Sequence, residues 1–342
     1  MHFLKRVAMA SLAGMCMLAA TSTLAVDPPA HPDETARQQH DNALLVDALL
    51  AEATPRSMVL AATSLFSMGP DAQAIQQRKY DLLKQAAQRA PDDAWVQWFA
   101  ALHADPAEGE SKASLMLQQL EPDNGAVWLF PLSAATRAND DAGITDALAR
   151  IGTSPRFDDR FIAFTLEWLD FFRAHPGFLG GTDKNGAAHS APALDMAIGR
   201  AAALAMPNLA DALRACRSVE QPLTVKRREA CLAAGRLIAN ESNTFMAQAL
   251  GIAMLRSAGA DDVAELTRSH AYLARMSVGI FDGLHEDPQA LARYQSDLLK
   301  TGSEVQAVRN ALTRAGTPPV PPADWKPDAY PQLENGDKAH VG

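Results

Sequence analysis

The sequence predicts an all-α protein, and two observations lead to this prediction. Ala, Leu, Arg, Gln and Glu dominate the long runs of the 342-residue chain, and these residues favour helices. Runs that alternate Val, Ile or Thr with polar residues are nearly absent, so the chain gives no clear strand signal. A third observation concerns the arrangement of the helices. Pro91, Pro122 and Pro155 lie 31 and 33 residues apart, within the range of repeats built from helix pairs.

Residues 1–25 have the features of an export signal. Lys5 and Arg6 precede an apolar run from residue 7 to residue 20, and Thr23-Leu24-Ala25 offers small residues where a signal peptidase cleaves. An uncleaved membrane anchor is the alternative, but the apolar run is shorter than the roughly 20 residues that a spanning helix needs. We therefore expect residues 1–25 to be a cleaved signal peptide.

A lipoprotein signal at Cys16 is a second alternative. The bulky Met15 precedes this cysteine, at a position where lipoprotein signals have a small residue. A cleaved signal peptide remains the favoured interpretation. We therefore expect a periplasmic or secreted mature chain that does not stay inserted in the membrane after signal cleavage.

The charge of the mature chain argues against two classes of partner. Removal of residues 1–25 leaves 29 Lys and Arg against 40 Asp and Glu, a net charge of −11. A chain this acidic lacks the basic surface of a nucleic-acid-binding protein. It is also poorly suited to adsorb on anionic lipid. We therefore expect no nucleic-acid partner.

Two cysteines, Cys216 and Cys231, remain in the mature chain. In an oxidising compartment a lone pair of cysteines usually forms a structural disulfide. A catalytic or metal-binding pair is more often spaced as Cys-x-x-Cys, which this sequence lacks. The disulfide requires the connection between the cysteines to fold back, because the two Cα atoms must come within about 7 Å.

After the signal peptide, the chain should form a series of helices separated by Pro, Gly and polar residues. Asp33 and Glu34 can begin the first helix, and Thr54-Pro55 marks the beginning of the second. Gly69-Pro70 ends the second helix, and Asp71 has the position of an N-cap for the third.

Three helical hairpins should follow, each with a proline at its turn. Helices this short cannot bury their apolar faces alone, so each must stack on the next. Short turns make neighbouring helices antiparallel. The expected pairs are 72–90 with 92–104, 109–120 with 124–137, and 140–151 with 157–174.

The stretch 72–155 resembles the tetratricopeptide family of helical repeats. The consensus of that family has Trp near the beginning of the first helix, small residues within the pair and Pro at its end. The matching positions are Trp95, Trp98, Ala113 and Pro122 in one unit and Trp128, Ala134, Ala135, Ala147 and Pro155 in the next. Pro131 departs from the pattern. The resemblance implies helical hairpins stacked as a solenoid or superhelix that holds protein partners.

An aromatic stripe follows the repeats, with a spacing that places its members on one helical face. The stripe contains Phe157, Phe161, Phe164, Trp168, Phe171 and Phe172. Such stripes are usually core, and we expect a core seam here. The alternative is an exposed groove for a peptide or an apolar ligand. The candidate residues of such a binding surface are Trp168, Phe171, Phe172, His175 and His189.

The glycine-containing loop 176–192 is longer than an ordinary connection between helices, and long loops are often functional. Asp183-Lys184-Asn185-Gly186 has the beginning of a calcium loop but lacks its later acidic ligands. We place the domain boundary in this loop. The expected segments are the signal peptide 1–25, an N-terminal helical half 26–175, the long loop 176–192, a C-terminal helical half 193–316 and a Pro-rich tail 317–342.

The C-terminal half should contain seven further helices. They are expected at 192–206, 208–217, 223–240, 243–257, 261–282, 287–301 and 303–315. Asp287 before Pro288 is typical of an N-cap followed by the first helical residue. The tail contains six prolines and should be extended. We expect it to dock in part, through Trp325.

The sequence contains no signature of a nucleotide-binding loop, a dinucleotide fold, a zinc protease or a serine nucleophile. Its nine histidines are dispersed, so we expect neither a metal site nor a cofactor. The predicted function is a protein- or peptide-binding scaffold of the cell envelope, leaning away from an enzyme. One alternative is an α-helical enzyme with a site assembled from distant residues near the loop 175–192. Another is a structural array without a dedicated ligand.

Overall fold

The computed structural model of the chain describes residues 32–65, 71–104, 110–182, 188–190, 193–204, 209–217, 222–284 and 287–327. These residues form fifteen α-helices, α2 to α16, which confirms the all-α prediction. Two 3-10 helices and one pair of three-residue strands complete the described part of the chain. The chain divides into two compact units, Met1–Ala260 and Asp261–Gly342, which are described separately.

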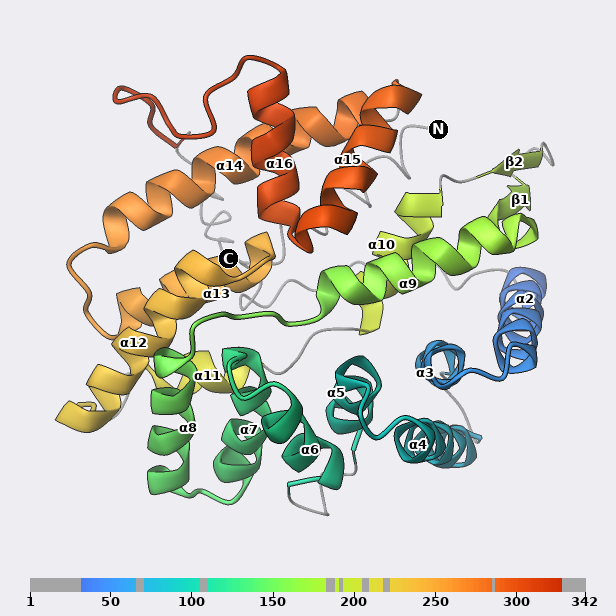
Figure 1. Cartoon of the computed structure of the whole chain (residues 1–342), viewed down its shortest axis with the longest axis horizontal. Helices are drawn as coiled ribbons and strands as arrows, with labels where there is room; N and C mark the ends of the chain where they lie inside the picture. Colours follow the sequence, from blue (N-terminus) through green and yellow to red (C-terminus); the bar gives the residue numbers. More distant parts are fainter. Residues whose placement is uncertain are drawn as a thin grey trace, which may run out of the picture. The chain divides into compact units, whose positions relative to one another are not determined.

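The first unit contains most of the helices (Figure 1). Its first six are α2 (Pro32–Ala51), α3 (Pro55–Ser64), α4 (Ala72–Arg89), α5 (Ala94–Leu102), α6 (Lys112–Leu120) and the 3-10 helix η3 (Gly125–Trp128). The middle of the unit is formed by α7 (Leu129–Arg137), α8 (Asp141–Thr153), α9 (Phe161–Ala174) and η4 (Pro176–Leu179). The last four helices are α10 (Ala193–Leu204), α11 (Leu209–Ala215), α12 (Val225–Glu241) and α13 (Phe245–Ser257).

Helix starts follow local capping chemistry. The Thr54 hydroxyl accepts a hydrogen bond from the backbone N–H of Ser57, and Ser57 Oγ accepts one from the backbone N–H of Thr54, which makes a reciprocal capping box. Asp93 accepts hydrogen bonds from the first turn of α5 in the same way. Asp71 occupies the N-cap position of α4 as expected, but its side chain makes no capping hydrogen bond. Pro131 is tolerated because it lies in the first turn of α7.

Helices near the N-terminus pack against their sequence neighbours. Helix α4 contacts α3 and α5, α5 contacts α6, and α7 contacts α8. The third expected hairpin, 140–151 with 157–174, is wrong. Helix α8 packs along α12 instead, and α9 packs along α10.

The segment between α8 and α9 explains this difference. Arg156 and Phe157 form isolated parallel bridges with Asn124 and Ser242, so the chain runs extended beside two distant turns. Arg160 then takes a left-handed backbone conformation, with φ of 64°, immediately before α9 begins at Phe161. The extended segment separates α9 from α8, and the helix expected from residue 157 begins four residues later.

Helix α12 lies between α8 and α13 and approaches both closely (Figure 1). A Cβ added at Gly152 of α8 would lie 2.7 Å from the backbone nitrogen of Ala234. A Cβ added at Gly251 of α13 would lie 2.4 Å from the backbone nitrogen of Ala239 and 2.9 Å from the carbonyl oxygen of Gly235. We call these contacts the small-residue interface, because only glycine permits the backbones to come this close.

The loop 176–192 contains more structure than expected. After η4, strands β1 (Gly180–Thr182) and β2 (Ala188–Ser190) pair antiparallel, with Gly181 opposite His189. The chain then returns through α10 onto α9, so this loop lies inside the first unit. The division between the two compact units falls after this loop, at Ala260 and Asp261. The calcium-loop residues 183–186 lie outside the described part of the chain.

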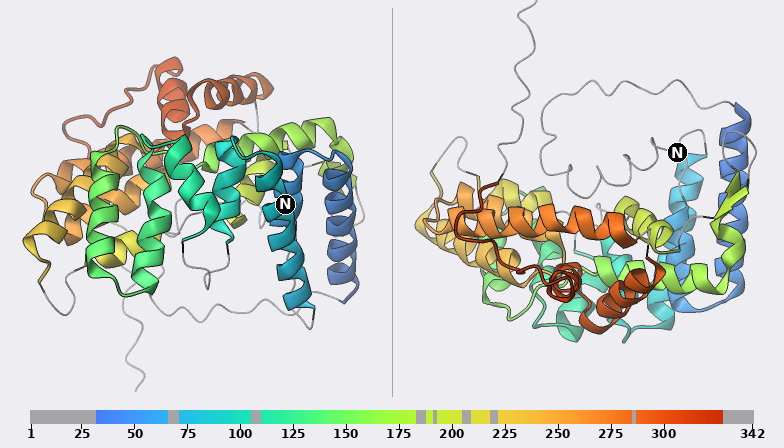
Figure 2. Two further views of the ribbon diagram at one scale, coloured as in Figure 1. Left: turned by 60° about the horizontal axis from the view of Figure 1, so that its bottom comes forward. Right: turned by 90° about the horizontal axis from the view of Figure 1, so that it is seen from above.

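The second unit contains α14 (Val263–Leu284), α15 (Pro288–Thr301) and α16 (Glu304–Arg314). The Asp287 side chain caps α15 and Pro288 is its first residue, as predicted. Residues 317–327 then run beside α14 (Figure 2). The Tyr272 hydroxyl donates a 2.8 Å hydrogen bond to the Pro318 carbonyl, and the Trp325 ring lies edge-on to the Tyr272 ring. This part of the tail is docked, as expected, and residues 328–342 lie outside the described residues.

Candidate functional site

The aromatic stripe is buried. Phe164 and Trp168 have no exposed surface, and the other members of the stripe are exposed by 7% or less. The Phe164 ring stacks on Phe99 of α5 at 4.4 Å between centroids, and the Trp168 ring stacks on Phe172 at 5.5 Å. We call this set the aromatic cluster: Trp95, Phe99, Phe164, Trp168, Phe171 and Phe172. The core interpretation is confirmed.

The exposed-groove interpretation therefore needs correction. Trp168, Phe171 and Phe172 were candidates for a binding surface, but their side chains are 5% exposed or less and contact other rings of the core. His175 lies at the C-terminal end of α9, half-exposed, with its ring 4.4 Å from the Phe171 ring. Its Nδ1 lies 3.9 Å from Oε1 of Glu52, the residue that follows α2. His189 is on β2, and its side chain lies outside the described set.

Arg56, at the start of α3, joins three helices. Its Nε and Nη2 donate hydrogen bonds of 2.8 Å and 3.4 Å to the two carboxylate oxygens of Asp93, the N-cap of α5. Its Nη1 pairs with Glu167 of α9, and its guanidinium lies 5.4 Å from the centre of the Trp95 ring. Burial raises the pKa of Glu167 from its ordinary value, and the neighbouring Arg56 opposes that rise.

A second polar network joins three distant turns, residues 121–125, 156–160 and 242–244, and we call it the three-turn junction. Arg156 binds Asp123 through two hydrogen bonds, 2.9 Å from Nε and 3.1 Å from Nη2, and these hold the pKa of Asp123 below its usual value. Arg160 pairs with Glu121 and, at 3.2 Å, with Asp158. The Arg156 and Arg160 guanidinium groups are therefore neutralised within the network.

Asp159 is the buried carboxyl of the three-turn junction and has no exposed surface. It accepts a 3.1 Å hydrogen bond from the backbone N–H of Phe161 and another of 3.1 Å from the hydroxyl of Thr244. Burial raises the pKa of Asp159 to about 6; the two hydrogen bonds oppose this rise, and the nearby Asp158 adds to it. The carboxyl thus ties the beginning of α9 to the beginning of α13.

His103 and Lys79 form a pair of basic groups between α5 and α4. Burial, and then the charge of Lys79, lowers the pKa of His103 to about 3, so its imidazole is neutral. Its Nε2 is buried without a hydrogen-bond partner among the described residues. The acidic residues Asp105 and Glu108 follow closely in the sequence but lie outside the described part, so this pair does not define a site by itself.

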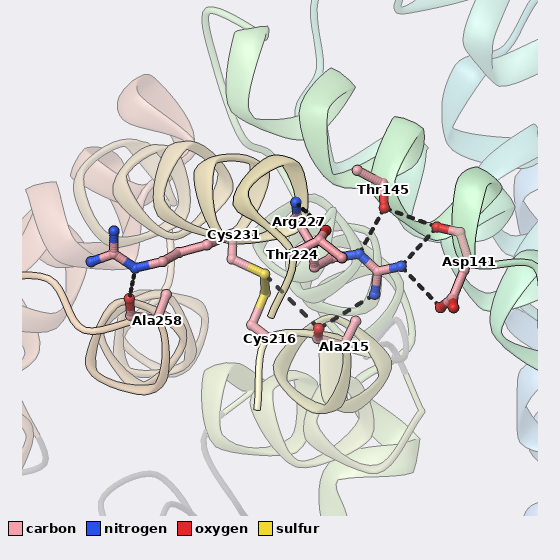
Figure 3. The surroundings of a disulfide bond; sticks show 9 residues. Asp141, Thr145, Ala215, Cys216, Thr224, Arg227, Cys231 and Ala258 are labelled. Carbon is pink, nitrogen blue, oxygen red and sulfur yellow. Dashed lines mark hydrogen bonds and ion pairs between the residues drawn. A yellow bond between two sulfur atoms is a disulfide. The ribbon is translucent and has the colours of Figure 1, made fainter. Parts of the chain in front are cut away.

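Cys216 and Cys231 form the predicted disulfide, with 5.6 Å between their Cα atoms (Figure 3). Both cysteines are fully buried. Beside them, Arg227 donates a 2.8 Å hydrogen bond from Nε to Thr145 Oγ1 and a 2.7 Å bond from Nη2 to the Asp141 carbonyl. The disulfide and Arg227 therefore fix the start of α12 against both α11 and α8, which is a structural role.

Arg200 of α10 differs from the arginines above. Its Nη1 donates a 3.3 Å hydrogen bond to Asn42 Oδ1 of α2, and its guanidinium lies 5.5 Å from the centre of the Trp168 ring. No carboxylate of the described residues pairs with it. Burial lowers the pKa of this guanidinium from its ordinary value. Sequence reasoning missed Arg200, because a single arginine in an alanine-rich helix belongs to no motif.

No group of three or more His, Cys, Asp or Glu side chains within the described residues is placed to hold a metal ion. Of the helices that the structure describes, none has both the length and the apolar character of a membrane span. Comparisons with protein-family models, with curated proteins and with solved structures found no match. The function is therefore inferred from the chain's own residues.

Proposed function

We propose that the protein is an exported helical scaffold of the cell envelope that binds a protein or a peptide. The observation that carries this proposal is the packing of α3, α4, α5 and α6, each against its neighbour in sequence. Arrays of this kind are extended by stacking and present broad surfaces to partners, as in the tetratricopeptide family that residues 72–155 resemble. The solenoid arrangement of this stretch is part of the proposal.

Two further observations support export and a scaffold role. The Cys216–Cys231 disulfide is the form that cysteines take in an oxidising compartment. Arg56 at the start of α3, Arg160 just before α9 and Arg156 in the extended segment between α8 and α9 are each paired with carboxylates. These ion pairs hold separate segments of the fold together.

The exposed apolar side chains suggest where to test for a partner. Leu115 of α6 is 47% exposed and lies in the repeat-like stretch, whereas Leu299 of α15 is 52% exposed and lies in the second unit. A photo-crosslinking amino acid would be placed at each position in the full chain, in cells that export it. We expect a discrete adduct from position 115 and none from position 299.

Export is tested in the same cells by deleting residues 1–25. The deletion should retain the protein in the cytoplasm and abolish the adduct at position 115. Absence of an adduct at position 115 in the exported chain, or equal adducts at both positions, would contradict the scaffold proposal. A turnover activity of the purified protein would favour the alternative of an α-helical enzyme.

A further inference from the structure

Three arginines of this protein use the same edge of the guanidinium to bind a carboxylate. Arg56 binds Asp93, and Arg156 binds Asp123. In each pair, Nε and Nη2 of the arginine donate hydrogen bonds to the two oxygens of one carboxylate. In the second unit, Arg268 binds Glu265 with the same two nitrogens, through hydrogen bonds of 2.9 Å from Nε and 3.0 Å from Nη2. This bidentate geometry matches the two parallel N–H groups of the guanidinium to the two oxygens of a carboxylate.

In Arg200 the corresponding edge makes no hydrogen bond with any described residue, and only Nη1 is engaged. Two segments next to these helices in the sequence also lack acidic residues. The segment 66–70, which follows α3, and the segment 205–208, which follows α10, contain neither Asp nor Glu. A half-buried guanidinium that lacks an anion is costly, because burial removes part of its hydration.

The side chain is nevertheless held in place. Asn42 Nδ2 donates a 2.9 Å hydrogen bond to the Ser64 carbonyl, which orients the Asn42 amide so that Oδ1 faces Arg200. The fully buried Trp168 ring supports the guanidinium from one face. Three helices thus position a cation without neutralising it, and a preorganised guanidinium binds an anion at a smaller entropic cost.

We propose that the Nε and Nη2 edge of Arg200 binds the carboxylate of a ligand, either a free organic acid or the C-terminal carboxylate of a peptide. A monoanion suits the site, because it has one cation and the whole chain carries a net charge of −9, which repels polyanions. The site does not depend on the proposed scaffold role, since a free acid would bind in the same way.

The test follows the side-chain Nε–H signal of Arg200 by NMR in the full mature chain. The probes are sodium acetate, the dipeptide Ala-Leu with a free carboxylate, the same dipeptide with an amidated C-terminus, and sodium chloride at equal ionic strength. We expect acetate and the free dipeptide to shift the signal in a saturable way. Amidated dipeptide and chloride should leave it unchanged. A shift with acetate alone would assign the site to free acids.

Two variants complete the test. Arg200→Lys keeps the positive charge but cannot make the bidentate hydrogen bonds of a guanidinium. This variant should bind the free-carboxylate probe at least about tenfold more weakly. Arg78→Lys, at an exposed position of α4, is the matched control and should leave binding unchanged. If the wild-type Nε–H signal does not move with any carboxylate, or moves equally with chloride, the proposal is wrong. That result would leave the crosslinking test of the scaffold unaffected.

Discussion

The aromatic cluster fills the space between α5 and α9 with large rings, whereas the small-residue interface brings the backbones of α8, α12 and α13 together. In the first region, stability comes from the buried area and ring contacts of side chains such as Trp168. In the second, it comes from close approach at Gly152 and Gly251. The comparison shows that helices of one unit can be sensitive to opposite changes, truncation in one region and enlargement in the other.

Trp168→Ala should be the most damaging change, because it removes the centre of the aromatic cluster. The loss of ring contacts and the remaining cavity should lower the free energy of unfolding by about 3–5 kcal/mol. Chemical denaturation of the two proteins measures this difference. Trp128→Ala is the control, since that ring is only half-buried, and its effect should be smaller. Equal losses at the two positions would contradict the assigned role of Trp168.

Removal of the disulfide by a Cys216→Ala and Cys231→Ala double change tests the clamp at the beginning of α12. The cysteines are 15 residues apart, and opening a loop of this size should cost about 3 kcal/mol in the chain-entropy account. The melting temperature should fall in the double variant, and in the wild type under reductant. A melt that reductant leaves unchanged would show that the disulfide contributes little to the small-residue interface.

Asp159→Asn tests the three-turn junction, which connects the beginning of α9 to the beginning of α13. The pKa of Asp159 is about 6 in the folded chain, above its ordinary value, so the folded state binds more protons than the unfolded state between pH 4 and pH 6. The contribution of Asp159 to stability is therefore full below pH 4 and is lost as the pH rises through 6. Over this pH range the free energy of unfolding should fall by roughly 2–3 kcal/mol because of this group.

The measurement for this third prediction is the difference in unfolding free energy between wild type and Asp159→Asn from pH 4 to pH 7. The variant should gain stability relative to the wild type as the pH rises. His103 acts in the opposite direction, because its lowered pKa makes the unfolded state bind more protons as the pH falls below its ordinary pKa. Its effect is common to both proteins and cancels in the difference. A difference that is constant with pH would contradict the buried state of Asp159.

Gly251→Ala should lower the free energy of unfolding least of the four changes. It tests directly whether the small-residue interface, unlike the aromatic cluster, is sensitive to enlargement of a side chain. The added methyl group would meet the α12 backbone, and the shift this requires should cost about 1–3 kcal/mol, partly offset by the better helix propensity of Ala. Gly199→Ala in α10 is the matched control, because a Cβ there meets nothing within 4 Å. That control should be neutral or stabilising by up to about 1 kcal/mol. Thermal unfolding of both variants provides the comparison.

The sequence predicts the aromatic cluster better than the small-residue interface, for a physical reason. Phe161, Phe164 and Trp168 are large aromatic residues that recur at helical spacing, so their burial on one helical face could be inferred. Gly152 and Gly251 lie among many alanines, and small residues give no amphipathic pattern that identifies a partner helix. The pairing of α8 with α12 joins distant segments, and local periodicity carries no information about it.

Helix boundaries were predictable because Pro, Gly and capping residues mark them locally, as at Thr54 and Asp287. The β1 and β2 pair was missed, since Gly180 and Gly181 interrupt any alternation of apolar and polar residues. The candidate site was missed for a different reason. Arg200 is positioned by contacts with Asn42 and Trp168, which lie on two other helices, and the sequence does not show these contacts.

The pairing of α8 with α12 also affects how the chain folds during synthesis, when the N-terminal residues emerge from the ribosome first. Arg227 reaches back across 86 residues to Asp141. Until α12 has emerged, the face of α8 around Gly152 lacks the helix that covers it. A nascent chain halted before residue 225 would present an incomplete layer to chaperones and proteases. Emergence of α12, rather than formation of the earlier helices, should therefore set the time at which the layer around α8 is completed.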